Sequence, residues 1–195
     1  MEKIKISIIF HSVCGNTFLM AKAFYDSLKT QNKNVHLYRI KDDDLEKWAD
    51  TFPVAKEFFN EMKTIPIAEP EVMLESDYII LGSPTYFGNV SSEMKAYMDS
   101  ASIFWIDGKL VGKKLTAFTS SSNAEGGGDL CLQAINTFGQ HMGMISIPIP
   151  ANLSSNKNFP AYGFIHYSGG LGDQRPNDDL YSAIKKYTEL YIPSR

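Results

Sequence analysis

The sequence predicts an α/β fold built on a doubly wound, five-stranded parallel sheet with strand order 2-1-3-4-5. Three observations predict it. Short apolar runs rich in β-branched residues have the character of strands buried on both faces. Segments with helical spacing alternate with these runs, which favours right-handed βαβ units. Polar loops containing glycine follow the strands, where such sheets bind ligands.

The first three elements follow from hydrophobic periodicity. Residues 3–10 contain Ile4, Ile6, Ile8 and Ile9 and are typical of a buried parallel strand. From Asn16 to about residue 31, apolar residues recur at helical spacing. Residues 34–40 alternate apolar and polar side chains, which indicates a less buried strand at an edge of the sheet.

The middle of the chain is the least regular part of the pattern. Residues 42–62 have helical composition interrupted by Pro53, which predicts two short helices. Residues 64–70 are expected to form an ordered surface connection, and residues 71–75 a helix or turn.

Strands and helices alternate again in the second half. Residues 78–82 form a compact apolar run that predicts a central strand. The elements expected after it are a helix over residues 91–101, a strand over 115–120, a helix over 130–142, a strand over 144–149 and a final amphipathic helix over 180–191.

Composition narrows the class of protein. The 195 residues, 44% of them hydrophobic, predict a single domain over residues 1–195. No apolar run approaches the roughly 20 residues of a membrane span, and no signal-peptide pattern is seen, so a cytoplasmic location is expected. A net charge of −3 without a basic patch argues against nucleic-acid binding.

Metal binding is not expected from the sequence. Cys14 and Cys131 are the only two cysteines, too few for a disulfide framework or a thiolate metal site. The one acidic cluster, Asp42 to Asp44, is interpreted as a solvated helix start, because negative charge is favourable near a helix N-terminus.

The strand order predicts where a ligand binds. In this topology the ligand lies beyond the carboxyl ends of the strands, so functional residues should gather after Phe10, Gly82, Ser120 and Ile149.

The loop after the first strand predicts a phosphate site. Hydroxyl and amide side chains lie there beside backbone N–H groups that open a helix, and such groups bind phosphate without a cationic side chain. The loop residues are Ser12, Val13, Cys14, Gly15, Asn16 and Thr17. An ordinary capped βα turn would have the same composition. Cys14 is interpreted as a small packed residue, the alternative being a thiol made reactive by the helix N-terminus.

The second loop suits a flat polar heterocycle. It contains a proline that fixes the turn, two aromatic residues and a glycine that permits close approach of the backbone. Its residues are Pro84, Thr85, Tyr86, Phe87 and Gly88. The alternative is a turn of unusually rich composition.

The third loop again supplies hydroxyl groups, followed by glycines ahead of a helix. Its candidate ligand-binding residues are Thr119, Ser120, Ser121 and Gly126. A simple flexible loop is the alternative. Three polar loops at one sheet edge nevertheless favour a shared ligand site.

These loops carry a family resemblance. The matching segments are residues 83–90 (SPTYFGNV), 118–121 (FTSS), 126–128 (GGG), 141–144 (HMGM) and 169–176 (GGLGDQRP), together with Met94, Asp99, Trp105, Gly108, Leu110, Gly112, Lys113, Tyr162 and Gly163. In this order they resemble the WrbA-type FMN-dependent NAD(P)H:quinone oxidoreductases, a flavodoxin-like family.

The resemblance implies a cofactor and a reaction. It implies FMN, reduced by NADH or NADPH and reoxidised by a quinone, in a homodimer or homotetramer whose neighbouring subunits complete the pocket. It assigns the phosphate to the first loop and the isoalloxazine to the second and third. It also brings Trp105, His141 and Tyr86 to the substrate pocket. Family members commonly carry arginine where Tyr86 stands and a second histidine where Met142 stands.

Two other functions use the same fold. A flavodoxin-type electron carrier would pass single electrons to protein partners, but such carriers are typically strongly acidic, unlike this chain. A flavin-binding regulator without turnover is the third possibility. The sequence does not identify the quinone, the preferred nicotinamide nucleotide or the reduction potential.

Overall fold

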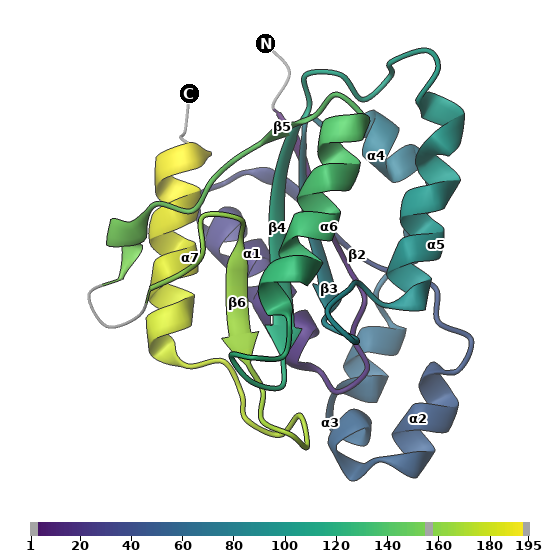
Figure 1. The fold of residues 1–195 in the computed structure, drawn as a ribbon, viewed down its shortest axis with the longest axis vertical. Coiled ribbons are helices and arrows are strands. Elements are labelled where there is room, and N and C mark those ends of the chain that lie inside the picture. Colours follow the sequence, from purple (N-terminus) through teal and green to yellow (C-terminus); the bar gives the residue numbers. More distant parts are fainter. Residues whose placement is uncertain (1–3, 155–157, 193–195) are drawn as a thin grey trace.

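Six parallel strands form one sheet with helices on both faces (Figure 1). The computed structural model describes residues 4–154 and 158–192. The strands are β1 (Lys5–Phe10), β2 (Asn34–Arg39), β3 (Tyr78–Pro84), β4 (Lys114–Ser121), β5 (Ile145–Ser146) and β6 (Phe164–Tyr167). The helices are α1 (Asn16–Thr30), α2 (Leu45–Thr51), α3 (Pro53–Lys63), α4 (Glu71–Glu75), α5 (Ser92–Ser100), α6 (Gly128–His141) and α7 (Asp178–Tyr191).

The strand order β2-β1-β3-β4-β5 is the predicted one, with β2 at an edge. The structure adds a sixth strand, because two short segments share the position beside β4. β5 pairs with the start of β4, where Lys114 lies opposite Ile145, and β6 pairs with its end, where Phe118 lies opposite Phe164. The strand expected over residues 144–149 is therefore only two residues long, and the chain leaves the sheet before it returns as β6.

Alternation along the strands divides the apolar side chains between two cores. On one face Ile6, Ile8 and Phe10 of β1 pack with α1 and α7. On the other, Ile9 and the alternate residues of β3 and β4 pack with α4, α5 and α6. Burial on both faces explains why these strands have nearly continuous apolar sequences.

Within the first core, a buried hydroxyl network links the sheet to the last helix. The hydroxyl groups of Tyr78 and Thr116 lie 2.6 Å apart, and those of Thr116 and Tyr187 lie 2.8 Å apart. Since each hydroxyl has a partner, these polar groups are buried without an unpaired donor or acceptor.

Two short helices follow β2, as predicted from Pro53, which occupies the first turn of α3. The stretch over residues 64–70 is held to β2, because the N–H of Arg39 donates to the carbonyl of Pro66 and the N–H of Ala68 to that of Arg39. The expected first strand began at Lys3, which lies outside the described residues, as do the ends of the expected domain. Within the described ranges, no helix combines the length and apolar character needed to cross a membrane.

Candidate functional site

A cavity of about 390 Å³ lies at the carboxyl edge of the sheet, a volume typical of small-molecule sites. Loops that follow β1, β3, β4 and β6 surround it. Of the candidate residues, the lining includes Ser12, Val13, Cys14, Asn16, Thr17, Pro84, Thr85, Tyr86 and Ser120. No charged side chain lines it among the described residues. The lining of the cavity thus combines hydroxyl and amide groups with aromatic and apolar side chains.

The loop before α1 offers unpaired N–H donors. None of the backbone N–H groups of residues 12–18 donates a hydrogen bond to another described residue. Gly15 precedes the helix in the left-handed conformation, with φ +88°, and no side chain caps the helix. The first turn of α1 also lacks an acidic residue, whereas those of α5, α6 and α7 have at least one. The positive end of the helix dipole is therefore open to an anion.

Side chains of the first loop lie beside these N–H groups. Thr17 Oγ1 and Ser120 Oγ share a hydrogen bond of 2.8 Å, which joins the first loop to the third. Asn16 donates from Nδ2 to the carbonyl of Gly172 at 2.6 Å, and its Oδ1 is buried without a partner. The donor chemistry fits the phosphate of FMN without a lysine or arginine in the lining.

The loop after β6 and helix α3 pack against the first loop, residues 12–17, on the side away from the cavity lining. Arg175 donates from Nη1 to the carbonyls of Cys14, at 2.7 Å, and Gly172, at 3.2 Å. It also pairs with Glu57 and lies 5.0 Å from the ring centre of Phe58. That ring packs so closely on Gly15 that a Cβ there would lie 2.3 Å from it.

The second loop turns sharply at the cavity. Tyr86 and Asn89 exchange backbone hydrogen bonds of 2.9 and 3.0 Å, and Phe87 and Gly88 both have positive φ at the tip. Tyr86 lines the cavity, while the side chain of Phe87 is fully exposed. Burial, assisted by the nearby charges of Cys14, Glu93 and Asp42, raises the pKa of Tyr86 well above its ordinary value. Its phenol therefore remains a neutral hydrogen-bond donor at physiological pH.

Of the four candidate residues in the third loop, only Ser120 lines the cavity. The other three hold the loop in position. Thr119 lies behind it, donating from Oγ1 to the carbonyl of Ser83 at 2.7 Å and contacting Thr85 Oγ1 at 2.8 Å. Ser121 donates to the carbonyl of Asn123, and Gly126 packs against that pair. These residues shape the loop without lining the cavity.

Trp105 and His141 lie together but at the opposite edge of the sheet. Trp105 donates from Nε1 to the carbonyl of His141 at 3.1 Å. Helix α6 begins at Gly128, beside Ser121 of the cavity edge, and ends at His141 after 14 residues, a length of about 21 Å. Within one chain, neither residue reaches the cavity.

Several lining residues were not identified from the sequence. They are Phe52, Val54, Ser168, Gly169, Gly170, Leu171 and Gly172. Beside β4, the loop at the carboxyl edge of the sheet follows Tyr167 and not Ile149, because β6 and not β5 reaches that edge. An apolar run, Phe164 to Tyr167, before a glycine-rich segment was the signal that could have revealed the strand.

Two sequence interpretations concern individual side chains. For Cys14, burial raises the pKa of the thiol, and the nearby charge of Arg175 only partly offsets this. The packed interpretation is therefore favoured over a reactive thiol.

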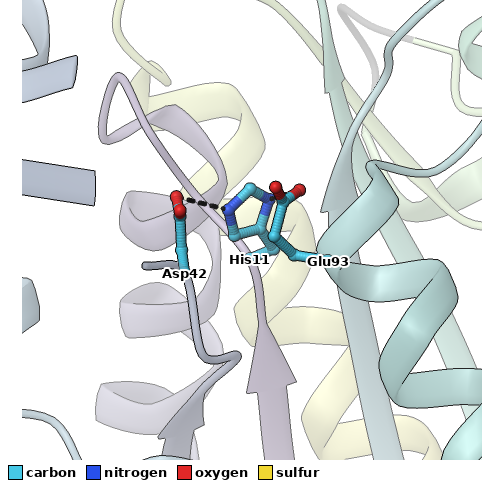
Figure 2. A group of neighbouring side chains, drawn as sticks. All are labelled: His11, Asp42 and Glu93. Carbon is cyan, nitrogen blue, oxygen red and sulfur yellow. Dashed lines mark hydrogen bonds and ion pairs between the residues drawn. The ribbon is translucent and has the colours of Figure 1, made fainter. Parts of the chain in front are cut away.

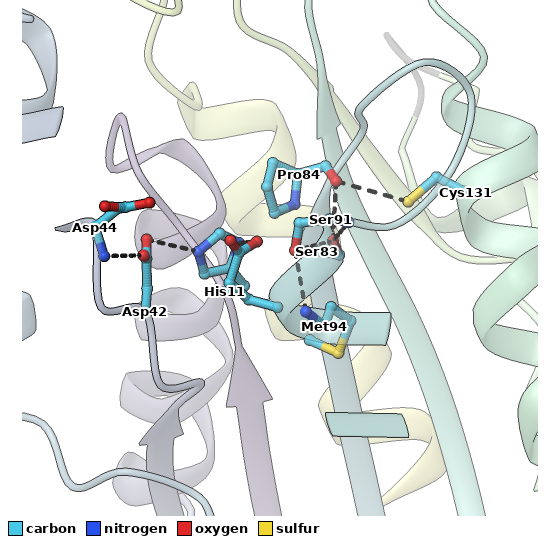
Figure 3. A network of polar contacts seen from close by, with 9 residues as sticks. His11, Asp42, Asp44, Ser83, Pro84, Ser91, Met94 and Cys131 are labelled. Carbon is cyan, nitrogen blue, oxygen red and sulfur yellow. Dashed lines mark hydrogen bonds and ion pairs between the residues drawn. The ribbon is translucent and has the colours of Figure 1, made fainter. Parts of the chain in front are cut away.

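The acidic cluster differs from the prediction, because Asp42 is not solvated. Its side chain is 3% exposed and accepts hydrogen bonds from His11 Nε2 at 3.1 Å and from the N–H of Asp44 at 2.9 Å (Figure 3). Burial raises the pKa of Asp42, but the hydrogen bond from His11, with smaller contributions from Asp44 and Arg39, outweighs this effect and holds the pKa below its ordinary value. Asp43 and Asp44 remain exposed, as predicted.

A larger groove of about 1200 Å³ lies at the opposite, amino edge of the sheet. Its lining includes several lysines, but Lys5 pairs with Glu75, and Lys113 donates to the carbonyls of Leu74 and Ser76. These cations are engaged within the chain. The smaller cavity is the better candidate site, because four strand-end loops converge on it.

Comparison with known proteins points the same way. Residues 4–158 match a family described as NADPH-dependent FMN reductase. A protein of Chromohalobacter salexigens named NAD(P)H dehydrogenase (quinone) is 30% identical, covering 90% of this chain and 89% of its own. One of the same name from Archaeoglobus fulgidus is 32% identical over 75% of this chain and 76% of its own.

Solved structures share the fold at lower identity. A flavodoxin, WrbA-like protein from Agrobacterium tumefaciens superposes with a TM-score of 0.64 at 20% identity, covering 94% of this chain and 92% of that one. Flavodoxin 2 from Bacillus cereus gives a TM-score of 0.62 at 19% identity, covering 94% of each chain.

Proposed function

Because the chain belongs to the NADPH-dependent FMN reductase family, we propose that it is an FMN-dependent NAD(P)H:quinone oxidoreductase. Its relatives named NAD(P)H dehydrogenase (quinone) support this activity. The observation that carries the proposal is the open N-terminus of α1. Its unpaired N–H groups belong to a loop that lines a cavity with both polar and apolar side chains.

The phosphate of FMN would be held by the first loop. The backbone N–H groups of residues 12–17 and the hydroxyls of Ser12 and Thr17 supply its donors, and the helix dipole adds positive potential. The bond between Thr17 and Ser120 fixes one of these hydroxyls in place. Fixed donors need no reorganisation when the anion arrives, which favours tight binding.

The flat ring system would lie along the second and third loops. Pro84, Thr85 and Tyr86 form one wall, and Leu171 and Phe52, from segments far apart in the chain, form others. When bound, FMN supplies the electron transfer, accepting a hydride equivalent from NAD(P)H and delivering two electrons to a quinone. The protein excludes water with these apolar walls and orients both substrates against one surface. The neutral Tyr86 phenol can donate a hydrogen bond to a quinone or nicotinamide oxygen.

We further propose a homodimer or homotetramer in which a neighbouring subunit completes the pocket. Trp105 and His141 lie too far from the cavity of their own chain to act there. Large apolar side chains near Trp105 are exposed, among them Ile103 at 63% and Ile106 at 87%. An assembly that covers them could bring Trp105 of one subunit to the cavity of another. We also propose that residues 1–195 form a single domain and that the protein is located in the cytoplasm. Its two cysteines are both free, which supports the cytoplasmic location.

Titration of the FMN-free protein with FMN and with riboflavin tests the cofactor site. We expect flavin fluorescence to be quenched at one equivalent, with FMN bound much more tightly than riboflavin because only FMN has the phosphate. Changing Ser12 and Thr17 together to alanine should reduce that preference. Equal affinity for both flavins in the unaltered protein would refute the phosphate assignment.

Stopped-flow mixing then tests the reaction. The FMN-loaded protein should lose its absorbance near 450 nm on mixing with NADH or NADPH and regain it when a quinone is added. If neither nucleotide reduces the flavin, the electron-carrier function replaces the reductase.

A further inference from the structure

Three ionisable side chains converge beside the cavity from separate elements. His11 follows β1, Asp42 follows β2, and Glu93 lies in the first turn of α5 (Figure 2). Their ligand atoms lie within 4.8 Å of one another. His11 is 2% exposed, the Asp42 side chain 3% and the Glu93 side chain 28%.

The imidazole of His11 is oriented by Asp42. The carboxylate of Asp42 accepts from Nε2, so Nε2 carries a proton and donates. Asp42 is itself fixed, because its second oxygen accepts the N–H of Asp44. In the neutral imidazole this arrangement leaves a lone pair on Nδ1, which points toward Glu93 in Figure 2 and has no hydrogen-bond partner among the described residues.

Glu93 is held in place by the start of its helix. Ser91 caps α5 by accepting the N–H of Met94 at 3.2 Å, and its own N–H donates to Ser83 Oγ at 2.9 Å, at the end of β3 (Figure 3). These bonds fix the helix start relative to the sheet that carries His11.

The distance between His11 Nδ1 and Glu93 Oε2 is suited to two ligand atoms that bind one cation. His11 Nδ1 and Glu93 Oε2 lie 3.8 Å apart, beyond hydrogen-bond distance. Two ligand atoms bound to one Zn²⁺ at about 2.0–2.2 Å lie about 3.4 Å apart at a tetrahedral angle and farther apart at wider angles. Neither Glu93 nor Asp42 forms an ion pair with a lysine or arginine in the described part of the chain. The Glu93 carboxylate and an unpaired nitrogen lone pair therefore face one small space, and Asp42 lies on the other side of the imidazole ring (Figure 2).

We propose that His11 Nδ1 and the Glu93 carboxylate bind a divalent first-row transition cation such as Zn²⁺, with Asp42 orienting the imidazole through Nε2. A carboxylate that accepts from the second ring nitrogen of a metal-binding histidine is a common outer-shell arrangement. Water fills the remaining positions, since Glu93 is partly exposed. The cation would link the ends of β1 and β2 to the start of α5. This proposal does not depend on the activity proposed above.

Zinc titration by calorimetry tests it, using FMN-saturated protein from which metals have been removed with a chelator. We expect one equivalent of Zn²⁺ to bind and to raise the melting temperature. Glu93→Gln should weaken binding at least ten-fold. Asp99→Asn, at the other end of the same helix and paired with Lys95 on the surface, is the matched control and should bind as the unaltered protein does.

A second measurement needs no variant and observes the buried histidine directly. Long-range ¹H–¹⁵N NMR of the unaltered protein should show the Nδ1 resonance of His11 shifting on addition of Zn²⁺ while Nε2 stays protonated. Equal zinc affinity in the unaltered protein and Glu93→Gln would overturn the proposal. So would an Nδ1 resonance that already carries a proton and does not respond to Zn²⁺, because a proton would then bridge His11 to Glu93.

Discussion

Replacing Arg175 should weaken FMN binding, although the residue does not line the cavity. Its guanidinium donates to the carbonyls of Cys14 and Gly172, pairs with Glu57 and lies over the Phe58 ring. It therefore connects the loop proposed to bind the phosphate, the loop after β6 and helix α3. Arg175→Ala removes these interactions together and lets the first loop adopt other conformations.

The size of the effect follows from the interactions that the arginine makes. A hydrogen bond from a charged donor contributes about 1.5–3 kcal/mol, the cation–π interaction about 0.5–1 kcal/mol, and the exposed pair with Glu57 less than about 1 kcal/mol. If about 1.5–3 kcal/mol of loop ordering must then accompany cofactor binding, the Kd for FMN rises about 10- to 150-fold. Riboflavin, which has no phosphate to bind the loop, should lose much less affinity.

Fluorescence titration of both flavins measures this difference. Arg175→Lys should recover only part of the affinity, since an ammonium lacks the planar fork that reaches two carbonyls. Glu57→Gln, which removes only the exposed pair, is the control and should change the Kd less than about three-fold. An unchanged FMN affinity in Arg175→Ala, or equal losses for FMN and riboflavin, would refute the bracing role.

Three further predictions concern stability and reactivity. Gly15→Ala should lower the free energy of unfolding in urea by about 2–4 kcal/mol, because its Cβ would meet Phe58 at 2.3 Å. The control is Gly112→Ala, which has a similar φ but open space around it and should cost only about 1 kcal/mol. Equal costs for the two variants would contradict the packing argument. The pKa of Asp42 lies below its ordinary 3.8, so its ionised form stabilises the fold above that pH and this contribution disappears as the pH falls through the lower folded value. Asp42→Asn should therefore flatten the acid limb of the stability profile, and an unchanged limb would show that other carboxylates govern it. The raised pKa of Cys14 predicts slower iodoacetamide labelling at pH 7 than for a free cysteine, and a rapid reaction would show an activated thiolate.

The local order of the fold was predictable because each strand and helix has its own periodicity. The runs containing Ile8 and Ile80 are buried on both faces, and Pro53 does divide two short helices. The carboxyl-edge loops followed from topology, which is why Ser12, Thr17 and Tyr86 could be predicted as site residues from the sequence.

Periodicity did not predict that two short strands share the fifth position of the sheet. β5 and β6 are two and four residues long, too short to give a distinct pattern, and each depends on pairing with β4 for its stability. As a result, the loop containing Gly172 was not included in the predicted site, although it contacts Asn16 directly.

The sequence by itself thus determined the class of fold, the polar loop that opens the first helix and the edge of the sheet that carries the cavity, because these depend on residues close together in the chain. Only the tertiary structure decided which distant side chains meet. His11 and Asp42 are 31 positions apart, and their burial together converted an apparently solvated acidic cluster into a fixed carboxylate–histidine pair. Likewise, the length and direction of α6 separate His141 from the cavity. Such contacts depend on how strands and helices pack, which periodicity along the chain does not encode.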